Sequence, residues 1–285
     1  MPNPTSESQP HPTILVFDSG LGGLTVFREV FAARPDARFV YLADDDAFPY
    51  GDLAEDALIA RVTAVLGDAI ARHRPDLAVI ACNTASTLAL EALRARFSVP
   101  FVGTVPAIKP ACAQSHSKRI AVLGTLATVG REYTRALIHE FADDCEVVLV
   151  GSPHLAAFAE AELQDEPVSD AAIAAEIAPC FVEADGRRPD TVVLACTHYP
   201  LLIARLRKLA PWPVQWLDPA PAIARRVADL LKDRPAVASP PPAPVIVFTS
   251  GRDLSPSLVE ALAGYGFAWA AQGPDGSFDR RAPGP

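Results

Sequence analysis

One segment of the sequence occurs twice, with the second copy 114 positions further along the chain. Residues 74–84 read RPDLAVIACNT and residues 188–198 read RPDTVVLACTH. Each copy has a turn, a continuous apolar run and then a cysteine, and such a run is typical of a parallel strand covered by helices on both faces. A weaker repeat relates residues 14–19 to residues 120–125 in the same order. The duplication predicts two similar units built from parallel strands.

Short apolar runs alternate with longer amphipathic segments along most of the chain. The runs expected to form strands are residues 14–17, 39–42, 77–81, 101–102, 120–123, 146–150, 191–195, 215–217 and 245–249. Helical periodicity marks residues 55–73, 84–97, 131–141, 171–184, 201–209 and 220–232. This alternation predicts an α/β fold. We expect two similar parallel-sheet α/β domains that face each other across a central active-site cleft.

The repeats also suggest limits for the two domains. We expect the first domain to cover residues 13–106 with residues 219–272 returning to it, and the second to cover residues 107–218. Residues 235–244 are rich in proline and are expected to form a loop. The two polar ends, residues 1–12 and 273–285, are expected to be disordered.

Charge and composition exclude several kinds of partner. The 285 residues carry a formal net charge of −9 with no basic stripe, so we expect no nucleic-acid binding. No apolar stretch approaches the roughly 20 residues that span a bilayer, so we expect no membrane segment. Residues 1–12 lack the basic start and apolar run of a signal peptide. The five cysteines include no CxxC pair, which indicates neither a disulfide framework nor a structural zinc site and favours a cytoplasmic location.

Residues at four predicted strand ends can carry chemistry. In parallel α/β sheets, ligands bind beyond the carboxyl ends of the strands. The groups found there are Asp18-Ser19, Cys82-Asn83-Thr84, Gly124-Thr125 and Cys196-Thr197-His198. If the two units face each other, both cysteines approach one cleft from opposite sides. A racemase needs that arrangement, because one group removes the α-proton from one face of a carbon and its partner delivers a proton to the other face. A thiol suits both roles, since its ordinary pKa of about 8.5 is lowered at a helix N-terminus.

Other interpretations of these residues stay open. Cys196 and His198 could form a nucleophilic pair, although that leaves the Cys82 copy unexplained. Cys82, Cys196 and His198 could instead bind a catalytic zinc ion, although their spacings match no common zinc motif. The glycine-rich turn at residues 20–23 is not a dinucleotide fingerprint, because Thr25 stands where GxGxxG requires glycine. The amides of this turn could still hold a carboxylate.

Cofactor chemistry is less consistent with the sequence. Pyridoxal phosphate commonly assists removal of an α-proton and requires a Schiff-base lysine. The chain has four lysines, and Lys109 lies near no phosphate-binding glycine loop. We therefore expect no cofactor and no metal. Cys112, Cys145 and Cys180 are expected to be plain buried core residues.

Five motifs together resemble the glutamate racemase family. They are FDSGLGGLT at residues 17–25, PYG at 49–51, ACNTAS at 81–86, PAIKP at 106–110 and CTHYP at 196–200, in family order. The resemblance implies a cofactor-independent enzyme of the aspartate/glutamate racemase superfamily that interconverts L- and D-glutamate for peptidoglycan synthesis. We expect a cytoplasmic homodimer. The alternatives are a racemase of the same fold acting on aspartate or hydantoins, and a non-catalytic dicarboxylate-binding protein.

The resemblance also implies a role for each matching residue. Cys82 becomes the base towards D-glutamate and Cys196 the base towards L-glutamate, each acting as the acid in the reverse direction. Asp18, His198 and Glu160 are implied to assist the thiols. For Glu160 a solvated helix residue is the other interpretation, because His154 and its neighbours depart from the family pattern. The residues implied to hold the substrate are Asp18, Ser19, Pro49, Tyr50, Gly51, Asn83, Thr84, Thr125, Thr197 and His198.

Overall fold

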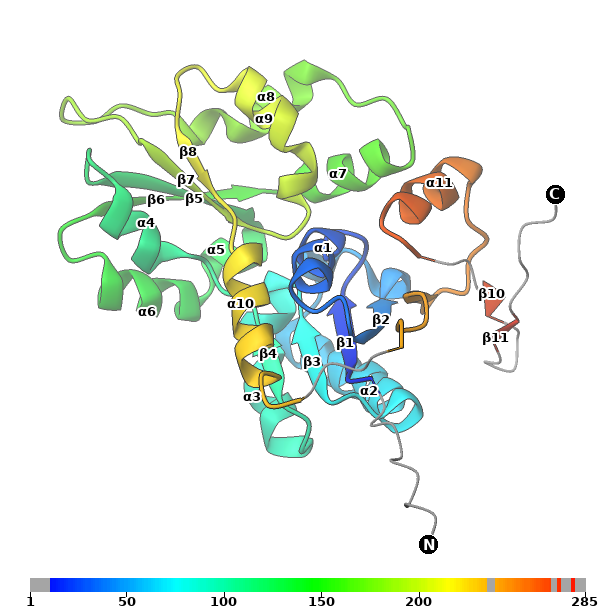
Figure 1. Cartoon of the computed structure of the whole chain (residues 1–285). Helices are drawn as coiled ribbons and strands as arrows, with labels where there is room; N and C mark the ends of the chain where they lie inside the picture. Colours follow the sequence, from blue (N-terminus) through cyan, green and yellow to red (C-terminus); the bar gives the residue numbers. More distant parts are fainter. Residues whose placement is uncertain (1–10, 235–238, 268–270, 273–277, 280–285) are drawn as a thin grey trace, which may run out of the picture.

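The structure, a computed structural model, describes residues 11–234, 239–267, 271–272 and 278–279. Most of its strands belong to two separate parallel sheets (Figure 1). The first sheet has the strand order β4-β3-β1-β2-β9, and each neighbouring pair runs parallel. Its strands are β1 Thr13–Asp18, β2 Arg38–Ala43, β3 Leu77–Ile80, β4 Phe101–Gly103 and β9 Val245–Phe248.

Helices cover both faces of the first sheet. Three of them pack on one face, namely α1 Leu24–Ala33, α10 Ala220–Leu230 and α11 Pro256–Gly264. Two others pack on the opposite face, namely α2 Glu55–His73 and α3 Asn83–Arg96. Because α10, β9 and α11 come from the end of the chain, the first sheet joins segments that are far apart in the sequence (Figure 1).

The second sheet has the order β6-β5-β7-β8 and is also parallel. Its strands are β5 Arg119–Thr125, β6 Glu146–Ser152, β7 Thr191–Ala195 and β8 Gln215–Leu217. One face packs against α7 Leu155–Leu163, α8 Asp170–Ile177 and α9 Ile203–Leu209. The other face packs against α4 Ile108–Gln114 and α6 Glu132–Phe141, while the short helix α5 Leu126–Gly130 follows β5 directly.

Burial on both faces explains the continuous apolar runs of the sequence. In β1, Ile14 and Val16 face the core beneath α1 and α10, while Leu15 and Phe17 face the core beneath α2 and α3. Successive side chains of a strand point to opposite faces, so every position must be apolar when both faces are covered. The predicted fold class, two parallel-sheet α/β domains, is confirmed.

Several predicted boundaries differ from the structure. The helix predicted over residues 171–184 ends at Ile177, and a 3₁₀ turn, Ala178–Cys180, follows. Pro179 explains the early end, because proline lacks the N–H donor that would continue the i→i−4 hydrogen bonds of the helix. Similarly, a 3₁₀ turn at Tyr199–Leu202 precedes α9, so that helix begins at Ile203 instead of residue 201.

The C-terminal part of the chain returns to the first sheet, because β9 pairs with β2. The proposed domain limits, 13–106 with 219–272 and 107–218, remain a prediction. Apart from 11–12 and 278–279, the ends predicted to be disordered lie outside the described residues, as do residues 235–238 of the proline-rich loop. A short antiparallel pair, β10 Ala271–Gln272 and β11 Phe278–Asp279, lies beyond α11. Among the described residues, no helix combines the length and apolar character needed to cross a bilayer.

Candidate active site

The carboxyl ends of β1, β3, β5 and β7 meet at a pocket between the two sheets. The residues lining it are Ser19, Phe48, Pro49, Tyr50, Gly51, Cys82, Asn83, Thr84, Thr125, Thr128, Ala156, Cys196, Thr197 and His198. Every site residue expected from the sequence lines this pocket except Asp18 and Glu160. Phe48, Thr128 and Ala156 were not predicted. The parallel topology brings these segments together, because the same ends of all the strands in a parallel sheet lie at one edge.

Cys82 stands at the junction of β3 and α3. It is the N-cap of α3, and its Sγ accepts a hydrogen bond from the Ala85 N–H at 3.4 Å. Its Sγ also lies 3.6 Å from the Ser19 hydroxyl oxygen. Burial and the nearby Asp18 carboxylate raise the pKa of Cys82 to about 12. Before any substrate enters, this thiol is therefore protonated at neutral pH.

Cys196 has a different set of neighbours. It follows β7, and a 3₁₀ turn that continues into α9 comes after it, so Cys196 does not cap an α-helix as Cys82 does. Its Sγ lies 3.8 Å from Nδ1 of His198. On the far side of the imidazole, Nε2 of His198 lies 3.0 Å from the Glu160 carboxylate. The structure thus contains a buried chain of a thiol, an imidazole and a carboxylate.

The Glu160–His198 pair sets the charges of this chain. Burial opposes ionisation of both groups, but hydrogen bonding to Cys196 and Glu160 raises the pKa of His198 well above its usual value. For Glu160, burial alone would raise the pKa. The hydrogen bonds that Glu160 makes with His198 and the Leu21 N–H outweigh burial, so the pKa of Glu160 is lowered. Glu160 is 8% exposed, so the interpretation as a solvated helix residue is wrong.

The glycine-rich turn after β1 binds carboxylates that belong to the protein itself. The Leu21 N–H donates to Glu160 at 2.8 Å, and the N–H groups of Gly20 and Gly23 donate to Asp18 at 3.2 and 3.1 Å. At Gly22, an added Cβ would lie 2.3 Å from Nδ1 of His198. Glycine is needed there because the His198 ring from the second half of the chain packs directly on the turn.

Asp18 is fully buried behind the pocket lining. Its second carboxylate oxygen lies 3.3 Å from the Thr197 hydroxyl, which donates to it. Burial raises the pKa of Asp18, and the charge of Glu160 adds to this effect. The charge of Asp18 therefore acts on the Cys82 thiol, and its carboxylate binds the loop that carries Cys196.

The pocket wall offers an unpaired amide and a group of hydroxyls as polar groups for a ligand. Asn83 is 2% exposed, and neither its side-chain nitrogen nor its oxygen has a hydrogen-bond partner among the described residues. Buried polar groups are nearly always paired, so an unpaired amide facing a pocket indicates a ligand. Across the pocket, hydroxyls from both halves of the chain meet, with Thr84 Oγ1 3.4 Å from both Thr125 Oγ1 and Thr128 Oγ1.

The other cysteines lie elsewhere. Cys112 and Cys145 pack together in the core beneath α4 and α6, and Cys180 packs in the core beneath α8. All five thiols are free. Within the described part of the chain, no group of three or more His, Cys, Asp and Glu side chains is arranged to hold a metal ion, and Cys82, Cys196 and His198 form no such group.

Two parallel-sheet domains that each bring a strand-end thiol to a shared pocket define a class of protein, the two-domain α/β racemases. The family model of the Asp/Glu/hydantoin racemases matches residues 25–227 of the chain. A glutamate racemase from Brucella canis is 59% identical over 226 residues, which make up 79% of this chain and 82% of that protein. The chain belongs to the Asp/Glu/hydantoin racemase family, on its glutamate racemase branch, and the resemblance stated from the sequence motifs is confirmed.

Solved structures of the family have the same architecture. Escherichia coli glutamate racemase, in complex with L-glutamate and the activator UDP-MurNAc-Ala, matches with a TM-score of 0.82 at 41% identity over 90% of this chain and 96% of that chain. A glutamate racemase isoform from Bacillus anthracis matches with a TM-score of 0.76 at 27% identity over 91% and 96% of the two chains. The expectation that the chain is an enzyme of the racemase type is confirmed.

Proposed function

We propose that this enzyme interconverts L- and D-glutamate by proton transfer between two thiols. The observation that carries the proposal is that Cys82 and Cys196, which follow strands of different sheets, line one pocket. Beside them lies Asn83, whose buried amide has no partner in the described part of the chain. The relatives supply the substrate class, since those compared above are glutamate racemases.

The transfer balances without any further reactant. The Cys82 thiolate takes the α-proton of D-glutamate, and the Cys196 thiol delivers a proton to the opposite face, which forms L-glutamate. Cys82 then holds the proton and Cys196 is the thiolate, so the pair is ready for L-glutamate. The reaction needs no cofactor in either direction.

Substrate binding itself prepares the Cys82 thiol. The raised pKa of Cys82 keeps it protonated in the empty site. An ammonium group within roughly 4–6 Å lowers a thiol's pKa, because the positive charge favours the thiolate. The buried Asp18 carboxylate favours an ammonium group at the same place. We assign the substrate carboxylates to Asn83, the threonine hydroxyls and the turn at residues 49–51.

The second thiol is assisted by the Glu160–His198 pair. The His198 imidazole lies 3.8 Å from Sγ of Cys196, and hydrogen bonding to Glu160 favours its charged form and orients it. The two thiols therefore work in unlike surroundings, with a carboxylate near one and an imidazolium near the other. Asp18 and His198 act through the thiols, as the family resemblance implies.

Isotope exchange tests the two-thiol mechanism. Enantiomers have equal free energies, so kcat/KM must be the same in both directions for every variant, and the separate roles of the thiols appear only in exchange with solvent. In D₂O and without added cofactor, the wild type is expected to place α-deuterium in both enantiomers. Cys82→Ala and Cys196→Ala are each expected to abolish racemisation. Any exchange left in Cys196→Ala should be confined to D-glutamate, and any left in Cys82→Ala to L-glutamate.

Cys180→Ala is the matched control, because this cysteine is buried away from the pocket and its replacement should leave turnover intact. Racemisation that persists in either alanine variant at the pocket would refute the mechanism. A substrate panel tests the assignment to glutamate, and faster turnover of aspartate would overturn it. Binding of glutamate without exchange would favour the non-catalytic alternative. The supply of D-glutamate for peptidoglycan, the cytoplasmic location and the homodimer remain predictions.

A further inference from the structure

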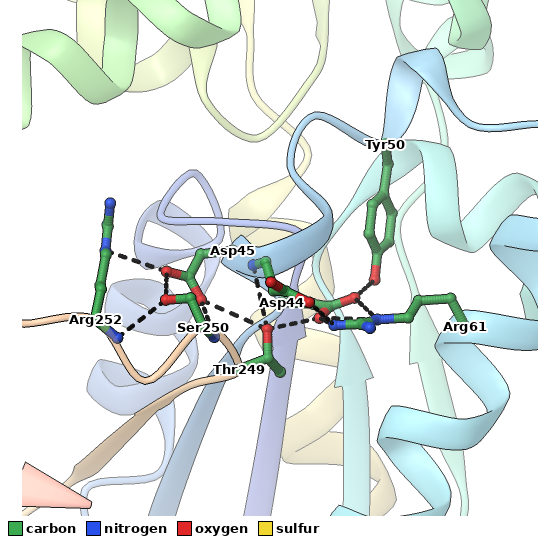
Figure 2. Close-up of polar contacts among 8 residues, drawn as sticks. Asp44, Asp45, Tyr50, Arg61, Thr249, Ser250 and Arg252 are labelled. Carbon is green, nitrogen blue, oxygen red and sulfur yellow. Dashed lines mark hydrogen bonds and ion pairs between the residues drawn. The ribbon is translucent and has the colours of Figure 1, made fainter.

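A buried carboxylate behind the pocket gathers donors from three parts of the chain. Asp44 follows β2 and is fully buried. It accepts hydrogen bonds from the Tyr50 hydroxyl at 2.5 Å, from the Thr249 hydroxyl at 2.7 Å and from Arg61, whose Nη2 lies 2.6 Å away (Figure 2). Arg61 Nε completes a two-pronged contact, with 3.0 Å to the second oxygen.

These donors leave Asp44 no free capacity for a ligand. Both oxygens are occupied, and Arg61 together with the hydroxyls of Tyr50 and Thr249 lowers the pKa of Asp44 against the opposing effect of burial. Burial and the Asp44 charge in turn raise the pKa of Tyr50. The Tyr50 hydroxyl therefore stays protonated and donates to Asp44, which excludes it as a general base in the reaction.

Tyr50 is also part of the pocket wall. Its side chain is buried and lines the pocket together with Pro49 and Gly51, while its hydroxyl points to Asp44 on the side of α2 and β9 (Figure 2). The N–H groups of Tyr50 and Gly51 have no hydrogen-bond acceptor among the described residues, whereas those of Asp52 and Leu53 close the turn at 3.3 Å each. The turn thus presents two unpaired N–H groups of the described structure beside the pocket, and the hydrogen bond from the Tyr50 hydroxyl to Asp44 holds it from behind.

We propose that Asp44, together with Arg61 and Thr249, is a positioning group that fixes the turn at residues 49–51 through the Tyr50 hydroxyl, so that the turn is held in place for substrate binding. This inference rests on the proposed function. The donors that fix Asp44 come from α2 and from the residue after β9, so distant segments converge on one side chain of the pocket.

Thr249, which donates to Asp44, lies outside the part of the chain that matches the family model. The family match ends at residue 227, whereas Thr249 belongs to the returning segment. Its N–H donates to the Ala43 carbonyl at 3.0 Å, which continues the pairing of β9 with β2. The C-terminal segment therefore contributes to substrate positioning without lining the pocket.

Tyr50→Phe is the direct test, because it removes only the hydroxyl and keeps the ring in the wall. A turn without this anchor should bind the substrate less well in the ground state and in the transition state alike, so KM should rise about tenfold for both enantiomers while kcat stays within about twofold. Thr249→Val removes one of several donors to Asp44 and should raise KM about threefold. Amide hydrogen exchange at Asp52 and Leu53 should accelerate in Tyr50→Phe.

Ser250→Ala is the matched control. Ser250 follows Thr249 directly but bonds to Asp45, so its replacement loosens the same segment without touching Asp44 (Figure 2). It should leave both KM and the exchange of the turn at wild-type values. If Ser250→Ala raised KM as much as Thr249→Val does, the proposal would be overturned. The rise in KM would then come from loosening the segment as a whole and not from loss of a bond to Asp44.

Two other results would also overturn it. One is a fall in kcat at unchanged KM in Tyr50→Phe, which would place the hydroxyl in the chemistry. The other is a Tyr50→Phe enzyme whose KM and turn exchange both match the wild type. If the wild type itself fails to racemise glutamate, the proposed function fails, while the exchange of Asp52 and Leu53 still shows whether Asp44 holds the turn.

Discussion

The buried Glu160–His198 pair allows a stability prediction of known sign. Glu160 accepts the Leu21 N–H at 2.8 Å and lies 3.0 Å from Nε2 of His198, and both side chains are at least nine-tenths buried. Glu160→Gln keeps the shape of the side chain and removes its charge. Two charge-assisted bonds of about 1.5–3 kcal/mol each become neutral bonds of about 1 kcal/mol each. The free energy of unfolding should therefore fall by about 2 kcal/mol near pH 6.

The size of this loss should depend on pH. The pKa of Glu160 is lowered in the folded state, so its contribution is present above the unfolded value of about 4.3 and is lost as the pH falls through the folded pKa. The pKa of His198 is raised, so its contribution is complete below about pH 6.5 and is lost as the pH rises through the folded pKa. The wild-type advantage over Glu160→Gln is largest between these two limits.

Urea denaturation followed by circular dichroism at pH 6 and then at stepwise higher pH measures this difference. Glu162→Gln is the control on the same helix, because Glu162 forms an exposed pair with Arg205 that should contribute at most about 1 kcal/mol. A difference between the wild type and Glu160→Gln that stays constant or grows above pH 6.5 would refute a charged Glu160–His198 pair.

Two further substitutions test the close packing of the site and its unpaired amide. Gly22→Ala should lower kcat/KM about a hundredfold, roughly 2.7 kcal/mol, because its Cβ would displace His198. Gly130→Ala, where an added Cβ meets nothing within 4 Å, should leave kcat/KM unchanged, and equal effects of the two would contradict the steric reasoning. Asn83→Ala should raise KM for glutamate about tenfold while urea stability stays within about 0.5 kcal/mol, since the amide bonds to no described protein group. A large loss of stability with unchanged KM would instead make Asn83 a structural residue.

Features that depend on local pattern could be predicted from the sequence. A short continuous apolar run that forms a strand needs cover on both faces, so the helix-covered parallel sheets follow from these runs and their alternation with helical segments. The repeated strand-cysteine unit predicted that Cys82 and Cys196 would both stand at strand ends. The ends of helices were less predictable where proline intervenes, as at Pro179, because a local break competes with an otherwise helical pattern.

Contacts between segments far apart in the chain could not be predicted in this way. The sequence suggested an external carboxylate for the amides of the glycine turn, whereas the packing of the two halves of the chain places the protein's own Glu160 on the Leu21 amide. Nothing in the local pattern around Asp44 shows that Thr249 would satisfy it.

The amino-acid order by itself therefore determined the strand units and the positions of the two thiols, because hydrophobic periodicity and strand-end placement are properties of short segments. Only the tertiary structure decided which charges surround each thiol and which groups hold the pocket wall. Those features depend on burial and on distances between side chains that meet only when the two sheets pack together.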